Sequence, residues 1–291
     1  MQPPRPPSPE SCAIIVAPSG GGAAAVAAAA AAAIATYPLD ALRIRWQTTP
    51  ASPSPLGLSA FASRVARAEG LAAAFVTPGL GAGVAAAAAA AAVGERLRGP
   101  ARGHFGAADP WGGLGAAAAA AAAAAALSTP LSLLKVRSQA VAGPALYRSD
   151  LAATTLVGWW RGAAAVGARG GLLCGGAVLG YDAADAALAE SAAADGLARR
   201  TAACFAAAVA AAAAAAPADA LATRFQALAP GQTAEDVAAA MREGESMLQA
   251  AAAMHKAEGT RAFYRGLAPN ALRLFLVFAA YDALRAPMDG T

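Results

Sequence analysis

The chain has 291 residues, of which 58% are hydrophobic and only 14% are charged. Because a soluble globular protein is about one quarter charged, this shortage of charge favours a protein that lies in lipid. The net charge of +4 comes without a basic cluster, which argues against nucleic acid binding, and three cysteines at unpaired spacings give no disulfide framework. Alanine supplies most of the apolar residues, so composition alone leaves open a low-complexity helical chain outside the membrane.

Six apolar runs follow a proline-rich segment, residues 1–11, which is expected to be a disordered tail. About 20 apolar residues suffice to cross the hydrocarbon core of a bilayer. The runs occupy approximately residues 13–37, 79–93, 111–128, 163–181, 201–216 and 267–284. Pro38 follows the first run and is expected to interrupt or kink its helix, because proline removes a backbone hydrogen bond. The pattern predicts an all-α membrane protein with six transmembrane helices.

A polar motif recurs three times, each time at the end of an odd-numbered run. Each copy has a proline, an arginine seven residues later and a glutamine nine residues later. The copies are Pro38/Arg45/Gln47, Pro130/Arg137/Gln139 and Pro217/Arg224/Gln226. The prolines are 92 and then 87 residues apart. A fixed spacing that returns at a nearly constant period predicts three structural repeats of two helices each.

Lysine and arginine are unequally divided between the two ends of the runs. Thirteen of the 22 lie on the side of the long loops, so these loops should face the positive-inside compartment. A soluble alanine-rich helix has no reason to divide its charges in this way. The long loops also contain amphipathic segments, 61–70 and 241–259, which are expected to lie as short helices at the membrane interface.

Two arginines, Arg169 and Arg273, are the charged residues that fall well inside spans. Ionisable residues within a membrane are functional by default, and a guanidinium binds carboxylate or phosphate through two hydrogen bonds. Each lies seven residues after the glycine of an aromatic-Arg-Gly step, so the two occupy equivalent positions in their repeats. The alternative is that they hold only backbone carbonyls. We expect an anion-binding site instead, with Gly170 beside Arg169.

The whole chain resembles the mitochondrial carrier family in these motifs. The triple proline motif carries the resemblance, together with the steps Trp160-Arg161-Gly162 and Tyr264-Arg265-Gly266. The first repeat has Phe75-Val76-Thr77 instead. The resemblance implies three repeats with pseudo-threefold symmetry, at residues 12–98, 111–185 and 199–285. The segments YPLDALRIRWQ and FAAYDALR are similar to the basic amino-acid and carnitine branch.

In this family the acid of one repeat pairs with the base of the next on the matrix side. The resemblance therefore implies the pairs Asp40 with Lys135 and Asp219 with Arg43. The third pair would be Ser132 with Ala222, in which neither side chain is charged. The glutamines of the three motifs would brace these contacts by hydrogen bonds. The expected matrix-side gate comprises Asp40, Arg43, Gln47, Lys135, Gln139, Asp219 and Gln226.

A second gate is expected on the opposite side, where the even-numbered runs end. Its expected members are Glu95, Arg98, Tyr181, Asp182, Tyr281, Asp282 and Arg285. Asp185 stands where a base is expected, so one pair there would set acid against acid. Tyr281 follows Arg273 by eight residues, whereas Tyr181 follows Arg169 by twelve. The last span is therefore expected to lack about one turn, or ~6 Å.

These features predict a transporter that moves a small carboxylate-bearing metabolite, an amino acid or an organic anion, by alternating access across the inner mitochondrial membrane. A basic amino-acid carrier and a non-transporting membrane scaffold remain as alternatives, and relatives exist in plastids and peroxisomes. An enzyme is not expected, because His104 and His255 stand alone without a nucleophile. No cofactor, metal or nucleic acid is expected. The expected partners are a small solute and the lipid bilayer, with cardiolipin as a candidate matrix-side lipid, and the expected state is a monomer.

Overall fold

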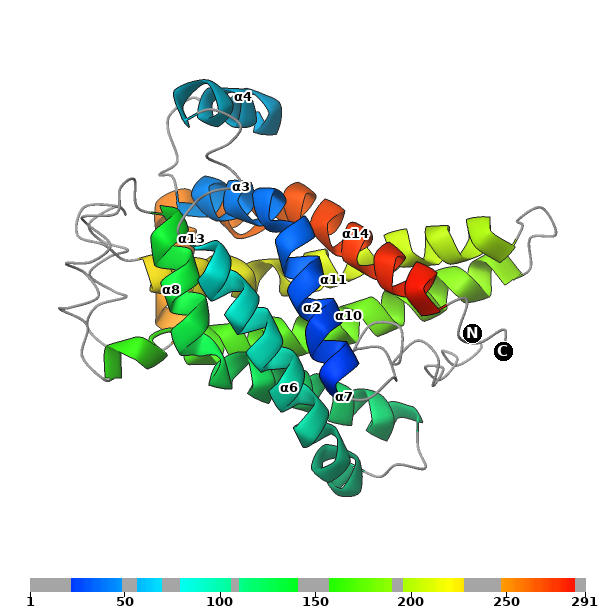
Figure 1. Cartoon of the computed structure of the whole chain (residues 1–291). Coiled ribbons are helices and arrows are strands. Elements are labelled where there is room, and N and C mark those ends of the chain that lie inside the picture. The colour runs from blue at the N-terminus through cyan, green and yellow to red at the C-terminus, as the bar shows by residue number, and fades with distance from the viewer. Residues whose placement is uncertain are drawn as a thin grey trace.

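The structure, a computed structural model, describes residues 22–48, 57–69, 79–105, 110–140, 157–189, 196–227 and 247–285 (Figure 1). The helices are α2 (Gly22–Ala35), α3 (Tyr37–Thr48), α4 (Leu58–Glu69), α6 (Leu80–Phe105), α7 (Pro110–Leu127), α8 (Thr129–Ala140), α10 (Ala163–Ala189), α11 (Gly196–Ala227), α13 (Met247–Glu258) and α14 (Leu267–Arg285). Two 3-10 turns, η1 (Val157–Trp160) and η2 (Thr260–Tyr264), precede α10 and α14. The expected tail, residues 1–11, lies outside the described residues.

The first and third spans are sharply bent at the residue pair before their prolines. The bend is 64° between α2 and α3 and 62° between α7 and α8. At each bend a hydroxyl bonds back to the preceding turn, Thr36 Oγ1 to Ala32 O at 2.7 Å and Ser128 Oγ to Ala125 O at 2.9 Å. This local bond competes with the helical ladder just where proline removes a donor, and together they turn the chain.

The fifth span differs, because α11 continues through Pro217 without a break. The interruption expected at Pro38 therefore does not recur at Pro217. Two residues before Pro217 stands Ala215, where the other repeats have Thr36 and Ser128. Without a hydroxyl to bond the preceding carbonyl, the proline alone leaves α11 as one helix of 32 residues.

Several helices are long and apolar enough to cross a membrane. Three described helices meet this criterion, over Leu80–His104, Gly158–Leu188 and Leu197–Ala227, and up to five spans result if each bent pair is counted as one. Helix α14, the sixth expected span, is not among these candidates; its side chains are described only as far as Tyr281.

The spanning helices form a closed ring. Each helix contacts the next in the order α2, α6, α7, α10, α11 and α14. Helix α14 then packs on α3, beside which it lies in Figure 1, and this contact closes the ring. Small residues allow these helices to approach closely. A Cβ placed on Gly176 would lie 3.0 Å from Ala210 O, and one on Gly180 would lie 3.0 Å from Ala206 O, both on α11.

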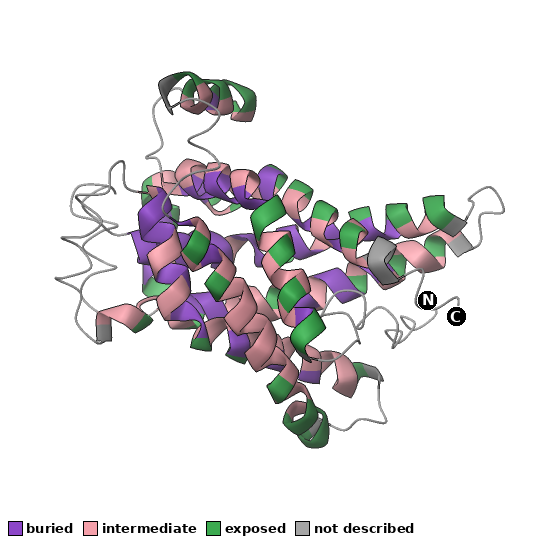
Figure 2. Cartoon of the chain, in the orientation of Figure 1, coloured by how far each residue is buried: buried purple, intermediate pink, exposed green. Residues whose placement is uncertain are grey.

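Helix α13 packs on the end of the ring where α3, α8 and α11 meet, whereas α4 stands off from that end (Figure 1). Met254 of α13 is fully buried against α11, and Trp46 of α3 stacks on Phe61 of α4 with ring centroids 5.9 Å apart. Figure 2 shows buried residues gathered around α8 and the neighbouring helix ends. Many of them are polar or charged, so this end of the ring holds a buried polar layer.

Candidate functional site

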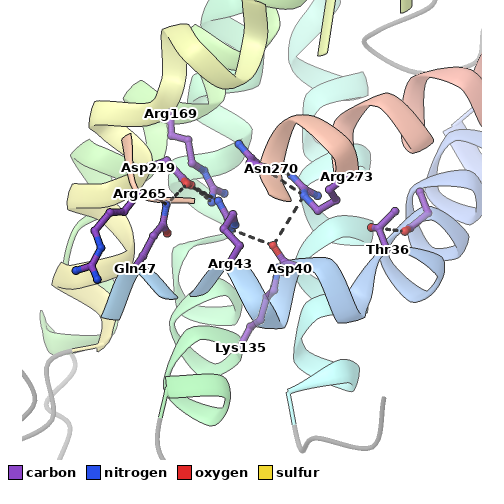
Figure 3. Close-up of polar contacts among 11 residues, drawn as sticks. Thr36, Asp40, Arg43, Gln47, Lys135, Arg169, Asp219, Arg265, Asn270 and Arg273 are labelled. Carbon is purple, nitrogen blue, oxygen red and sulfur yellow. Dashed lines mark hydrogen bonds and ion pairs between the residues drawn. The ribbon is translucent and has the colours of Figure 1, made fainter. Parts of the chain in front are cut away.

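Arg43 lies at the centre of the buried polar layer. Its Nη1 is 2.5 Å from both carboxylate oxygens of Asp219 on α11, and its Nη2 is 3.0 Å from Asp40 Oδ1, one turn earlier on α3 (Figure 3). All three side chains are at most 5% exposed. Hydrogen-bonded, charge-assisted contacts of this kind are the condition under which buried charges are tolerated.

Lys135 joins the same layer from α8. Its Nζ forms an ion pair with Asp40 Oδ2, so this carboxylate is bound from its own helix by Arg43 and from the next repeat by Lys135. The two interrepeat ion pairs that the resemblance implied, Asp40 with Lys135 and Asp219 with Arg43, are thus both present. They link α3 to α8 and α11, which are distant in sequence.

The third interrepeat contact is uncharged. Ser132 of α8 accepts a hydrogen bond of 2.7 Å from Gln226 Nε2 of α11 and donates one of 2.9 Å to Thr129 O. Ala222, the expected partner of Ser132, is buried and packs in the apolar cluster beneath α13. Because neither Ser132 nor Ala222 is ionic, the repeat boundary between α8 and α11 holds no unpaired charge from this pair.

The three motif glutamines have different environments. Gln47 Nε2 donates to Asp219 Oδ2 at 2.9 Å and to Arg265 O at 3.0 Å, so it braces the Arg43–Asp219 pair and ties α3 to the turn before α14. Gln226 braces the neutral contact at Ser132. The side-chain amide atoms of Gln139 are buried, and within the described part of the chain they have no hydrogen-bond partner.

The motif arginines also link the repeats. Arg45 Nε donates to Gln139 O, and Arg137 Nε donates to Gln226 O, each at 3.3 Å. Arg224, their equivalent in the third repeat, forms two hydrogen bonds with the carboxylate of Glu258.

A second arginine, Arg265, stands 4.0 Å from Glu258. Burial lowers the pKa of Arg265, and the nearby carboxylate of Glu258 opposes that shift. Sequence reasoning missed Glu258 and its bond to Arg224.

Arg169 and Arg273 approach the layer from α10 and α14. Arg169 Nη1 is 3.3 Å from Asp219 Oδ1, and Arg273 Nε is 3.9 Å from Asp40 Oδ1 (Figure 3). Asn270, one turn before Arg273, accepts from its Nε and Nη2 at 3.4 and 3.3 Å. Sequence reasoning missed Asn270, although its spacing of three residues from Arg273 places both on one helix face.

Gly170 does not face this site, so the expectation that it lines the anion-binding site is wrong. A Cβ at this position would lie 2.7 Å from both Ala121 O and Ala125 Cβ of α7. The direction that a side chain would take therefore points into the α7–α10 contact. Since Arg169 is one residue earlier, about 100° around the helix, it points elsewhere.

At the opposite end of the ring, the structure corrects the expected contact of Asp185 with another acid. Arg199 of α11 binds Asp185 of α10 through two hydrogen bonds of 2.7 Å. Glu95 and Arg98 pair along α6 at 2.6 Å. The base that the motif lacks at Asp185 thus comes from the start of the next helix.

The other residues expected in the opposite-side gate include three side chains that the structure describes, those of Tyr181, Asp182 and Tyr281. Tyr181 is buried in an apolar cluster of α10, α11 and α14. Asp182 and Tyr281 are partly buried. The side chains of Asp282 and Arg285 lie outside the described residues.

A closed ring of apolar helices that is sealed at one end by buried ion pairs, with two arginines reaching that seal from within spans, defines a membrane transport protein. The chain matches the family model described as mitochondrial carrier protein over residues 18–94 and 194–288. Because these segments cover more than half of its length, the chain belongs to the mitochondrial carrier family. No curated protein matches it.

Family membership sets the general function and the setting. Mitochondrial carriers are membrane solute transporters and not enzymes, so this chain is a multi-pass mitochondrial membrane protein with three repeats. The family assignment agrees with the sequence-based prediction of fold class. It does not distinguish the branches of the family, so the similarity to the basic amino-acid and carnitine branch stays a prediction.

Proposed function

We propose that this protein carries a small carboxylate-bearing metabolite across the inner mitochondrial membrane by alternating access, with Arg169 and Arg273 as its substrate-binding residues. One observation carries the proposal. The two guanidinium groups come from different helices, reach the same buried ion-pair layer, and each contacts one of its acids, Asp219 or Asp40. They are also more accessible than Arg43, at 26% and 22% against 3%.

The ion-pair layer serves in this proposal as the matrix-side gate. Opening it requires that Arg43 leave Asp219 and that Lys135 leave Asp40, and breaking one buried pair without compensation costs about 3–5 kcal/mol. A substrate carboxylate that binds Arg169 competes with Asp219 for that cation, and one that binds Arg273 competes with Asp40. Substrate binding thereby replaces the contacts of Arg169 and Arg273 with the gate acids, which couples occupancy of the site to the state of the layer.

The gate at the opposite end closes as the matrix-side gate opens, because alternating access requires that the two gates are never open at the same time. Its proposed members remain Glu95, Arg98, Tyr181, Asp182, Tyr281, Asp282 and Arg285. The Asp185–Arg199 pair supports a working gate there, because it removes the repulsion between acids that the sequence implied. With Asp185 neutralised, the approach of Glu95 to this end of α10 is not opposed by a bare carboxylate.

A basic amino acid is the less favoured cargo. Its amine needs an available carboxylate near the arginines. The acids that Arg169 and Arg273 contact, Asp219 and Asp40, are at most 5% exposed and are bound by Arg43, Gln47 and Lys135. The site therefore suits an organic anion better than a cationic amino acid.

Uptake into proteoliposomes tests the proposal against the alternative of a non-transporting scaffold. The purified chain is reconstituted and offered labelled carboxylates, nucleotides and amino acids, each against the same unlabelled compound inside. We expect exchange of at least one carboxylate and its loss in Arg169→Ala. The matched control is Arg64→Ala, an exposed arginine of α4. If no solute exchanges, and Arg169→Ala has no effect in cells, the chain is a scaffold and the proposal is wrong.

A further inference from the structure

The charges around the gate do not balance. Asp40 and Asp219 carry two negative charges, and Arg43 with Lys135 supplies two positive ones, so these four side chains are neutral together. Arg169 and Arg273 add two further cations. Within the described part of the chain, each of them pairs with one of these same two acids and with no other acidic side chain. The site therefore has two cations that the gate does not need for its own neutrality.

Geometry identifies the same two cations as the weakly held ones. Arg43 and Lys135 make the short contacts to the acids, whereas Arg169 and Arg273 stand off at 3.3 and 3.9 Å. The Nε–H of Arg169 has no hydrogen-bond acceptor in the part of the chain that the structure describes. Arg169 on α10 thus keeps a donor to offer to an incoming anion, and Arg273 on α14 is held by two long hydrogen bonds to the neutral Asn270, at 3.4 and 3.3 Å.

We infer that the substrate carries two separate anionic groups and is a dicarboxylate, with one carboxylate bound by Arg169 and the other by Arg273. The inference rests on the proposed transport function. Bound in this way, a dicarboxylate cancels both excess charges when the site closes. A monocarboxylate or a zwitterionic amino acid would leave one or two cations uncompensated within the bilayer, where unpaired charge is costly. The two arginines come from different helices and contact different acids, so each can bind its own anionic group.

Succinate and its half amide, succinamate, test this inference because they have the same length and differ in one carboxylate. Each is labelled and exchanged against itself in proteoliposomes at neutral pH. We expect the half-saturation concentration of succinate to be at least about tenfold lower, since an additional charge-assisted contact has that order of effect. Inorganic phosphate, with its charges on a single group, should exchange more weakly than succinate.

Variants of the two arginines show whether they are the origin of the preference. Arg273→Gln and Arg169→Gln should each bring the half-saturation concentrations of succinate and succinamate to within about twofold of one another, because one contact is lost and the other remains. Arg273→Lys keeps the charge and should retain a preference for succinate. Thermal unfolding of each variant without ligand shows that it is folded, and stabilisation by succinate but not succinamate gives a readout that does not require transport.

The possible failures are distinguishable. If succinamate or a neutral amino acid exchanges as well as succinate in the unmodified protein, or if phosphate exchanges better, the dicarboxylate inference is wrong while the transport function stands. If no compound in the panel exchanges and none raises the unfolding temperature, the proposed function itself is wrong.

Discussion

Replacing Arg43 by methionine should destabilise the protein strongly, because it removes the cation shared by both acids of the polar layer. Arg43 is 3% exposed and holds both oxygens of Asp219 at 2.5 Å. Removing one partner of a buried pair costs about 3–5 kcal/mol. Arg169 still stands 3.3 Å from Asp219, and Lys135 still binds Asp40. We therefore expect the free energy of unfolding to fall by about 3 kcal/mol, the lower end of that range.

The double variant Arg43→Met/Asp219→Asn isolates the pair. The double variant removes both charges. Its loss of unfolding free energy should therefore be smaller, by about 2 kcal/mol, than the sum of the losses of the two single variants. Thermal unfolding in detergent can be followed by a thiol-reactive dye, because Cys174 and Cys204 are buried thiols that become accessible on unfolding. A Cys12→Ser background removes the third cysteine.

The control for this cycle is Arg64→Met on the exposed face of α4, which should leave the unfolding temperature almost unchanged. If Arg43→Met is as mild as Arg64→Met, or if the two single losses simply add, Arg43 and Asp219 do not form the buried pair from which the gate is argued. An intermediate loss with strong coupling would instead mean that Arg169 takes over the position of Arg43.

Two further substitutions test the contacts that corrected the sequence-based predictions. Gly170→Ala should lower the unfolding temperature, because its Cβ would meet Ala121 O and Ala125 Cβ at 2.7 Å. The control is Gly175→Ala on the same helix, whose Cβ would meet nothing within 4 Å and which should be neutral or stabilising. Equal effects of the two variants in the same unfolding assay would contradict the α7–α10 contact. Arg199→Gln should lower the unfolding temperature less than Arg43→Met does, because the side chains of Arg199 and Asp185 are 35% and 36% exposed and water screens their charges. Adding Asp185→Asn should lower the unfolding temperature no further, and a second, additive decrease would mean that the two residues do not act as a pair.

The architecture could be predicted from the sequence because its main signal is repeated. One proline followed by an arginine and a glutamine is weak, but three copies at nearly equal intervals specify a threefold arrangement, and with it which acid faces which base. Asp40 and Lys135 are 95 residues apart in the chain, and no local pattern would pair them. The symmetry does, because it makes each interface between repeats equivalent to the next.

The sequence failed where the contact depends on rotation about a helix axis or on a neighbour outside the repeat pattern. Gly170 is adjacent to Arg169 in the chain, but one step along a helix turns a residue by about 100°, so it faces α7 instead. Asp185 meets Arg199 because two antiparallel helices bring their ends to the same side of the bundle. The signal was available in part, since Arg199 lies in the first turn of the helix that follows.

The departures from threefold symmetry also indicate which repeat controls the polar layer. At the α8–α11 boundary the layer is held by the uncharged Ser132–Gln226 bond and by Arg137 on a backbone carbonyl. The two ionic boundaries both involve α3, which supplies Arg43 to both acids and Gln47 to Asp219. Because partners in such a network strengthen one another, displacement of α3 breaks both ion pairs together, whereas separation of α8 from α11 breaks neither. We therefore expect α3, with the 64° bend at its start, to be the element whose movement opens this end of the carrier.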